Sequence, residues 1–110
     1  MKEVRIKENS WLAKLAAQKL KSERMAMVIG YTIHLYGVSA KTFMADKRWL
    51  QHELVHVEQY EETGFAMFLL KYIWQSFRYG YHNNKYEIEA RNSQKQQKLE
   101  NKYKVTLAET

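Results

Sequence analysis

The sequence predicts a small domain of the α+β class, and three observations support this prediction. The chain has 110 residues, enough for one domain with a modest core. Several segments carry apolar residues at the three- and four-residue spacing of amphipathic helices. Residues 25–37 are instead rich in Val, Ile, Thr and Tyr, with Gly30 and Gly37 as punctuation, which is typical of strands. The expected order is an N-terminal helix, a small β-sheet and further helices.

The first half of the chain predicts one helix and the sheet. Ser10 is a candidate N-cap for a helix over residues 11–23, whose apolar side chains recur at helical spacing. Residues 25–37 predict either one long bent strand or a pair of short strands. Residues 42–44 are expected to add a further short strand.

The second half of the chain is expected to be helical. Asp46 is the candidate N-cap of a helix over residues 47–63, which a glycine ends. A third helix is expected over residues 65–79, followed by a loop over residues 80–84. The last helix is expected from residue 85 to about residue 104, and its polar second half is typical of a segment that frays.

The whole chain, residues 1–110, is expected to form one domain, because neither a linker nor an internal repeat is visible. Its core is expected over about residues 10–93, with a polar helix or tail over residues 94–110. The chain has no cysteine, which excludes disulfides, thiolate metal ligands and cysteine nucleophiles. Any metal site must therefore be built from imidazole and carboxylate groups.

The net charge of +6 comes from Lys and Arg residues that lie mostly toward the two ends of the chain. A basic chain attracts anions, but no nucleic-acid-binding motif accompanies the charge, so nucleic acid is not an expected partner. Residues 65–77 form the most apolar stretch, which contains Lys71 and is too short to span a bilayer. A membrane-surface role for this stretch stays open. Because residues 1–24 have no signal-peptide pattern, a cytoplasmic location is expected.

The segment HELVH, residues 52–56, matches the pattern H-E-x-x-H. Residues four apart project from the same face of a helix, so His52 and His56 can each direct a ring nitrogen at one ion. Glu53 lies beside them, close to the ion but able to stay off it. In zinc hydrolases the metal lowers the pKa of a bound water toward about 7, and such a glutamate takes the proton. The motif therefore predicts a Zn²⁺ site with Glu53 as general base.

A third protein ligand is expected, because catalytic zinc usually has three protein ligands and a water. The downstream candidates are His82, Glu87 and Glu89. Glu87 and Glu89 are two positions apart on the expected last helix and face different directions, so only one of them is expected to bind. Glu87 has a structural alternative, since it could close a capping box with Asn84 as the N-cap.

The segments HELVHVEQY and NNKYEIEAR resemble the gluzincin branch of the H-E-x-x-H zinc peptidases, and most of all small bacterial domains that contain little more than this core. The resemblance covers about residues 31–92 and implies a minimal zincin-like fold. It implies that Glu87, which opens EIEAR, is the third ligand, with Glu89 as the second choice. Arg91 stands where the family often has an aspartate that braces the histidines.

The resemblance also implies features around the metal. In zincins an edge strand above the active-site helix binds extended peptide, and residues 31–37 are the candidate edge. His34 is expected to face either the cleft or a neighbouring strand. Gluzincins often steady the developing oxyanion with a Tyr or His before the ligand helix, and Tyr81 and His82 are the candidates. Covering the core is the other explanation for these loop side chains.

Two functions follow as hypotheses. The first is a zinc metallopeptidase, or another amide hydrolase, that attacks a peptide or protein substrate with a zinc-activated water and Glu53 as the base. The second is a non-catalytic zincin-fold module that keeps the metal for stability or binds a protein partner, because so short a chain has little left to build a substrate cleft. The presence of Glu53 favours the first, since a purely structural site needs no base. The sequence carries no signal for an oligomeric state.

Overall fold

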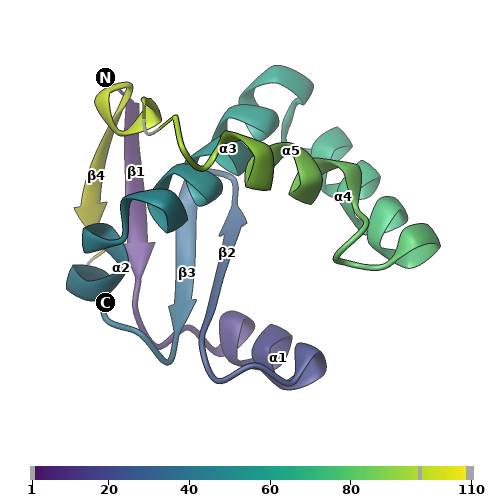
Figure 1. The fold of residues 1–110 in the computed structure, drawn as a ribbon, viewed down its shortest axis with the longest axis horizontal. Helices are drawn as coiled ribbons and strands as arrows, with labels where there is room; N and C mark the ends of the chain where they lie inside the picture. Colours follow the sequence, from purple (N-terminus) through teal and green to yellow (C-terminus); the bar gives the residue numbers. More distant parts are fainter. Residues whose placement is uncertain (1, 97, 109–110) are drawn as a thin grey trace.

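A computed structural model describes residues 2–96 and 98–108 of the chain. The elements follow one another as β1 (Lys2–Lys7), α1 (Trp11–Leu20), β2 (Met25–Ile29), β3 (Thr32–Tyr36), α2 (Ala40–Ala45), α3 (Lys47–Thr63), α4 (Phe65–Tyr79), α5 (Lys85–Ser93), a 3₁₀ turn (Leu99–Asn101) and β4 (Tyr103–Leu107). Within these described residues, five α-helices and a four-stranded mixed sheet form an α+β fold, which confirms the predicted class (Figure 1). The expected order is wrong at both ends, because strand β1 precedes the first helix and strand β4 follows the last one.

The sheet has the strand order β2-β3-β1-β4. β2 and β3 form an antiparallel hairpin, which confirms the second of the two arrangements expected for this segment. Gly30 lies at the turn with a positive φ of 63°, a conformation that glycine adopts without strain. β1 pairs in parallel with both β3 and β4. The first strand of the chain therefore lies inside the sheet, and the last strand, β4, lies beside it at one edge.

Helix α3 covers one face of the sheet and contributes to the largest core cluster. Leu50, Leu54 and Val57 of α3 are buried with Ile33 and Leu35 of β3. The helix has the predicted bounds, with its Trp49 amide donating to Asp46 Oδ1 at 3.1 Å and with Gly64 at its C-terminal end. Because this helix is anchored along one side in the core, its opposite side is held at a fixed place above the sheet.

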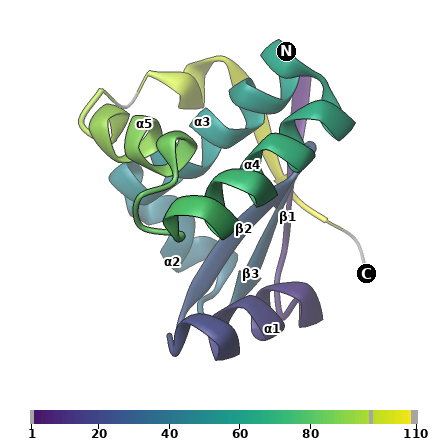
Figure 2. The same cartoon turned by 90° about the vertical axis from the view of Figure 1, so that its right-hand side faces the viewer.

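Helices α4 and α5 pack against α3 on the side that faces away from β4 (Figure 1). In Figure 2, α4 crosses in front of β2, and α1 lies below α4 at the bottom of the view. The bounds predicted for α4 and for the loop over residues 80–84 are confirmed. None of the helices in residues 2–96 and 98–108 is both long enough and apolar enough to cross a lipid bilayer.

Three secondary-structure predictions differ from the structure. Helix α1 ends at Leu20 and not near residue 23, because Lys21 adopts a left-handed conformation and its amide bonds the carbonyls of Ala17 and Gln18. Residues 42–44 lie in helix α2 and not in a strand, because Ser39 accepts a hydrogen bond from the Thr42 amide at 3.1 Å and so caps a short helix. The last helix ends at Ser93 and not near residue 104. Residues 103–107 form strand β4, so the expectation of a polar helix or tail over residues 94–110 is wrong there.

The expected limits of the core are too narrow at both ends. Val4 and Ile6 of β1, together with Leu99 and Tyr103, are buried in the core cluster. The segment KEVRIK, residues 2–7, alternates charged and apolar side chains and is a strand signal that the sequence reading passed over. The expectation that residues 31–37 form the sheet edge is also wrong, because β3 lies between β2 and β1, and the edge beside α3 and α4 is β2.

Candidate metal centre

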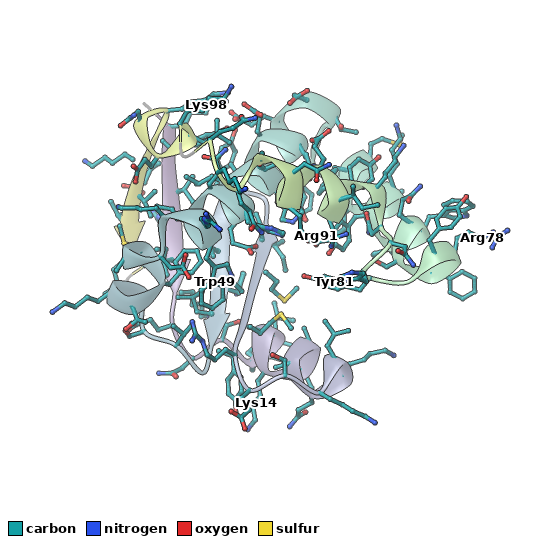
Figure 3. The ribbon with its side chains drawn as sticks, viewed as in Figure 1. Lys14, Trp49, Arg78, Tyr81, Arg91 and Lys98 are labelled. Atoms are coloured by element: carbon teal, nitrogen blue, oxygen red, sulfur yellow. The ribbon has the colours of Figure 1, made fainter. Side chains whose placement is uncertain are left out.

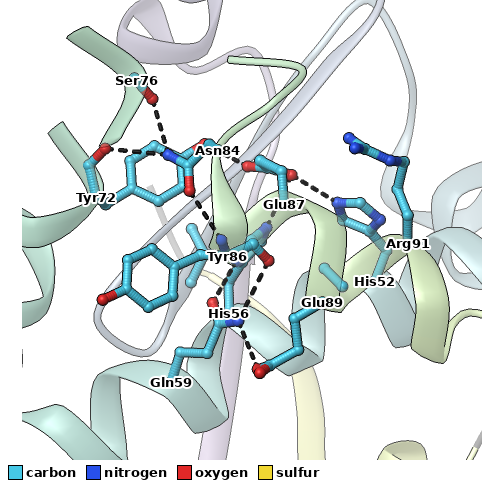
Figure 4. A network of polar contacts seen from close by, with 12 residues as sticks. His52, His56, Gln59, Tyr72, Ser76, Asn84, Tyr86, Glu87, Glu89 and Arg91 are labelled. Carbon is cyan, nitrogen blue, oxygen red and sulfur yellow. Dashed lines mark hydrogen bonds and ion pairs between the residues drawn. The ribbon is translucent and has the colours of Figure 1, made fainter. Parts of the chain in front are cut away.

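The two histidines of the motif lie on one face of α3, and both are buried. His52 Nε2 lies 2.9 Å from Glu87 Oε1, and His56 Nε2 lies 3.2 Å from the same oxygen (Figure 4). One donor atom from each of the three residues falls within 4.8 Å of the other two. Two imidazole nitrogens and one carboxylate oxygen therefore converge on a single buried point, with Glu87 arriving from a separate helix.

Asn84 sets the position of Glu87 by anchoring the start of α5. Its side-chain oxygen accepts from the Tyr86 amide at 2.9 Å, while its side-chain nitrogen donates to Tyr72 O at 3.0 Å and Ser76 Oγ at 2.9 Å. Asn84 is completely buried, so this residue ties the first turn of α5 to α4. Both oxygens of Glu87 are engaged with the histidines and with the Tyr72 hydroxyl, which contacts Oε2. The two carboxylate oxygens of Glu87 are therefore directed into the site, even though Asn84 is the N-cap of the same helix.

The amide of Gln59 orients the ring of His56. Gln59 Nε2 donates to Tyr86 O at 3.2 Å and to Glu89 Oε1 at 2.8 Å, and both of these partners are acceptors. The amide oxygen must therefore face His56, which places a proton on His56 Nδ1 at 2.8 Å from Gln59 Oε1. Nε2 is left as the nitrogen that faces Glu87. Glu89 thus lies outside the cluster of donors and acts on it through Gln59.

The second ring is contacted by another amide, because Gln94 Nε2 lies 2.7 Å from His52 Nδ1. Arg91, at the position where the resembled family often has a bracing aspartate, instead donates from Nη2 to the backbone oxygen of His82 at 2.6 Å. Gln59 therefore takes the place of the bracing carboxylate at His56. Gln94 instead donates to His52 Nδ1 and so leaves the ring proton of His52 on the Nε2 that faces Glu87. Sequence reasoning missed both. The position of Gln59, three residues after His56 on the same helix, was the only local signal.

Burial and charge shift the pKa values of the titratable groups at this centre. Burial raises the pKa of Glu53 to about 7, against the opposing attraction of His56 and His52. Burial alone would lower the pKa of His56, but the hydrogen bond and charge of Glu87 outweigh it and raise that pKa to about 9. Burial would raise the pKa of Glu87, yet the hydrogen bonds to His52 and His56 bring it well below its usual range. The centre thus favours a bound positive charge, whether proton or cation.

Tyr72 is a further member of the centre that the sequence did not indicate. Its ring lies edge-on to His56, with the ring centroids 5.9 Å apart, and its hydroxyl donates to Glu87 Oε2. Burial raises the pKa of Tyr72, and the negative charge of Glu87 raises it further, so the phenol stays a donor. Tyr72 lies on α4, one turn after the buried Phe68, and only the packing of α4 against α3 brings it here.

A cleft of about 290 Å³ opens beside the centre, between α1, edge strand β2, α3 and α4. Its walls are apolar and include Leu20, Met25, Met27, Ile29, Leu69 and Ile73. Glu53, His56 and Glu87 lie at the same cleft, together with Tyr72 and Tyr81. A second, more open cleft of about 470 Å³ reaches His52 and Glu53 from the side of His82 and Arg91. Glu53 is therefore reached from two directions despite its burial.

The remaining sequence candidates fall into two groups. Tyr81 borders both clefts, whereas His82 is exposed and borders only the second. His34 lies on β3, where its Nδ1 is 2.8 Å from Ser10 Oγ, and burial lowers its pKa. His34 is not among the residues that border either cleft. The structure thus brings Tyr81 to the centre and leaves His34 apart.

Comparison with protein-family models, with curated proteins and with solved structures finds no match for this chain.

Proposed function

We propose that this protein is a gluzincin-like zinc metallopeptidase in which His52, His56 and Glu87 hold one Zn²⁺. The observation that carries the proposal is the convergence of three buried donor atoms within 4.8 Å of one another. Two histidines and a glutamate are a donor set that catalytic zinc sites use, so the residues present fit this ion. The lowered pKa of Glu87 supports the same proposal, because it keeps a negatively charged oxygen beside the two imidazoles.

Glu53 is the general base in this proposal. Zinc, when bound, would lower the pKa of a coordinated water and polarise the scissile carbonyl. Glu53 follows His52 directly in the chain and borders both clefts, which supports a role in taking the proton from the attacking water and delivering it to the leaving amine. A pKa raised to about 7 suits a group that must both accept and release a proton near neutrality.

The two phenols have separate roles in the proposal. Tyr72 holds Glu87 Oε2, which leaves Oε1 directed at the two histidines, so Tyr72 positions a metal ligand. Tyr81 borders both clefts and stays protonated, because burial and the charge of Glu87 raise its pKa. Tyr81 is therefore the donor proposed to stabilise the developing oxyanion.

The substrate proposed for this site is an extended peptide. β2 is an edge strand whose partner among the described residues is β3, and Met25, Met27 and Ile29 of β2 line the first cleft. A peptide that adds to β2 as a further strand would run along this cleft past Glu53. The apolar walls favour apolar side chains in such a peptide.

Metal analysis and a mixed peptide library test the proposal together. The purified protein should contain about one zinc per chain, and removal of zinc by a chelator should lower its melting temperature. Glu53→Gln should keep the zinc and lose at least about 100-fold in hydrolysis rate, since only the base is removed. His52→Ala with His56→Ala should lose the zinc. Full zinc retention in that double variant would refute the metal site. If the wild type binds zinc but hydrolyses no peptide, the peptidase proposal fails and the protein is a non-catalytic metal-binding module.

A further inference from the structure

Helix α4 presents an apolar stripe to solvent. Leu70, Ile73, Trp74 and Phe77 are between 54% and 89% exposed. Their spacing of three and four residues is the one by which a helix normally presents a continuous apolar face to a core. Here that face points away from the protein, because the side of α4 that packs inward is centred on Phe68. These four residues are called the α4 stripe below.

All charged residues in the segment that carries the α4 stripe are basic. Lys71 and Arg78 are exposed on the same helix, and Lys85 follows at the start of α5. The chain has 12 acidic residues, yet none occurs between Gly64 and Tyr86. Figure 3 shows Arg78 at the outer end of α4, at the periphery of the molecule. An apolar ridge with a basic margin and no acid is therefore complementary to a surface that is apolar inside and anionic outside.

We propose that the α4 stripe docks on the surface of an anionic lipid bilayer, with α4 lying in the plane of the interface. Trp74 and Phe77 would enter the boundary between headgroups and acyl chains, while Lys71 and Arg78 would contact the anionic headgroups. The helix is too short to cross the bilayer, so it lies on the membrane instead of spanning it. This inference does not depend on zinc or on catalysis.

Two other occupants fit the α4 stripe less well. A second copy of the chain would bring Lys71 and Arg78 of both molecules together, with no acid in this segment to pair with them. A peptide partner is usually held in a groove, whereas the α4 stripe is a ridge on which Phe77 is 89% exposed. Ile73 belongs to both the stripe and the wall of the first cleft, so docking would bring that cleft close to the membrane surface.

Vesicle flotation tests the proposal. The wild type should bind vesicles of phosphatidylcholine mixed with phosphatidylserine, with the chelator present, and should be released by high salt. Lys71→Gln with Arg78→Gln should weaken binding roughly 25-fold, at about fivefold for each cation. Leu70→Gln with Phe77→Gln should weaken it by at least about tenfold. Leu107→Gln is the matched control, because Leu107 is 59% exposed on β4 and should leave binding unchanged.

Several results would overturn the proposal: no binding to the mixed vesicles, equal binding to vesicles of pure phosphatidylcholine, or an equal loss with Leu107→Gln. A concentration-dependent dimer that the Leu70 and Phe77 changes dissociate would assign the α4 stripe to a second copy instead. Zinc content and far-ultraviolet circular dichroism of each variant verify that it is folded. If the protein binds vesicles but hydrolyses no peptide, the peptidase proposal fails and the membrane proposal stands.

Discussion

At the scale of single residues, the amide side chain of Gln59 determines which ring nitrogen of His56 faces Glu87. Gln59 is fixed from behind by Glu89 and by Tyr86 O, so its oxygen can only face His56. Metal-binding histidines depend on such partners, because the group bonded to one ring nitrogen determines which tautomer is present and where the other nitrogen points. Glu87 and Glu89, two positions apart on α5, therefore contribute to one centre in different ways.

The two glutamates can be separated by zinc affinity. Glu87→Gln keeps the shape of the side chain but removes the negative charge, so zinc affinity should fall by at least about tenfold. Glu89→Gln keeps an oxygen that can accept from Gln59, so it should change the affinity little. Competition titration against a chromophoric chelator measures both. A large loss with Glu89→Gln alone would reverse the assignment, and no loss with either would exclude a glutamate ligand.

At the scale of secondary-structure elements, the start of α5 is the feature on which the centre depends. α5 is only a short helix, Lys85–Ser93, and short helices are marginal without caps and tertiary contacts. Asn84 supplies both, because its oxygen caps α5 and its nitrogen bonds Tyr72 O and Ser76 Oγ of α4. The same residue thus holds two helices together and sets the place from which Glu87 enters the site.

Asn84→Ala should therefore affect stability and metal binding together. The loss of a cap and of two buried hydrogen bonds should destabilise the protein by about 1–3 kcal/mol. Zinc affinity should fall as well, because Glu87 would no longer be held toward His52 and His56. Urea denaturation and chelator competition measure the two effects. Asn83→Ala is the matched control, since Asn83 is the exposed neighbour and should change stability by less than about 0.5 kcal/mol.

At the scale of the whole molecule, Glu61 joins the sheet to the end of α3. Its carboxylate accepts from Tyr31 at 2.8 Å, forms an ion pair with Lys2 at 2.9 Å and accepts from the Tyr103 hydroxyl. These partners come from the hairpin turn, from β1 and from β4. Burial would raise the pKa of Glu61, but the hydrogen bonds from Tyr103, Lys2 and Tyr31 lower it to about 2. The folded state therefore favours the charged carboxylate.

This pKa shift predicts how stability depends on pH. A carboxylate whose pKa is lower in the folded state stabilises that state above its ordinary pKa of 4.5, and the contribution is lost as the pH falls toward about 2. Glu61→Gln should destabilise the protein by about 1–3 kcal/mol at neutral pH. The difference in unfolding free energy between the two proteins should shrink between about pH 4.5 and pH 2. Urea denaturation across this range measures the difference, and Glu62→Gln, an exposed neighbour, should change the unfolding free energy by less than about 0.5 kcal/mol at neutral pH.

Several features of the fold and of the centre follow from local sequence signals. The spacing of the two histidines places them on one face of α3 wherever that helix packs. Asp46 caps its helix as predicted, and Asn84 takes the N-cap position considered as an alternative, because each side chain bonds an amide two or three residues away. Gly64 and Gly80 follow the helices that they were predicted to end. Each of these features needs only neighbours along the chain, so each could be predicted without a fold.

Tertiary structure decided the rest, because the contacts involved join residues far apart in the sequence. β1 and β4 pair in parallel across nearly the whole chain, and no turn signal announces such a pairing. That pairing brings both ends of the described chain into the sheet, and the pairing of β1 with β3 makes β2, not β3, the sheet edge beside the centre. Gln94 and Tyr72 reach the centre only because α5 and α4 pack on α3. Local patterns place side chains on the faces of their own elements, and only packing determines which faces meet.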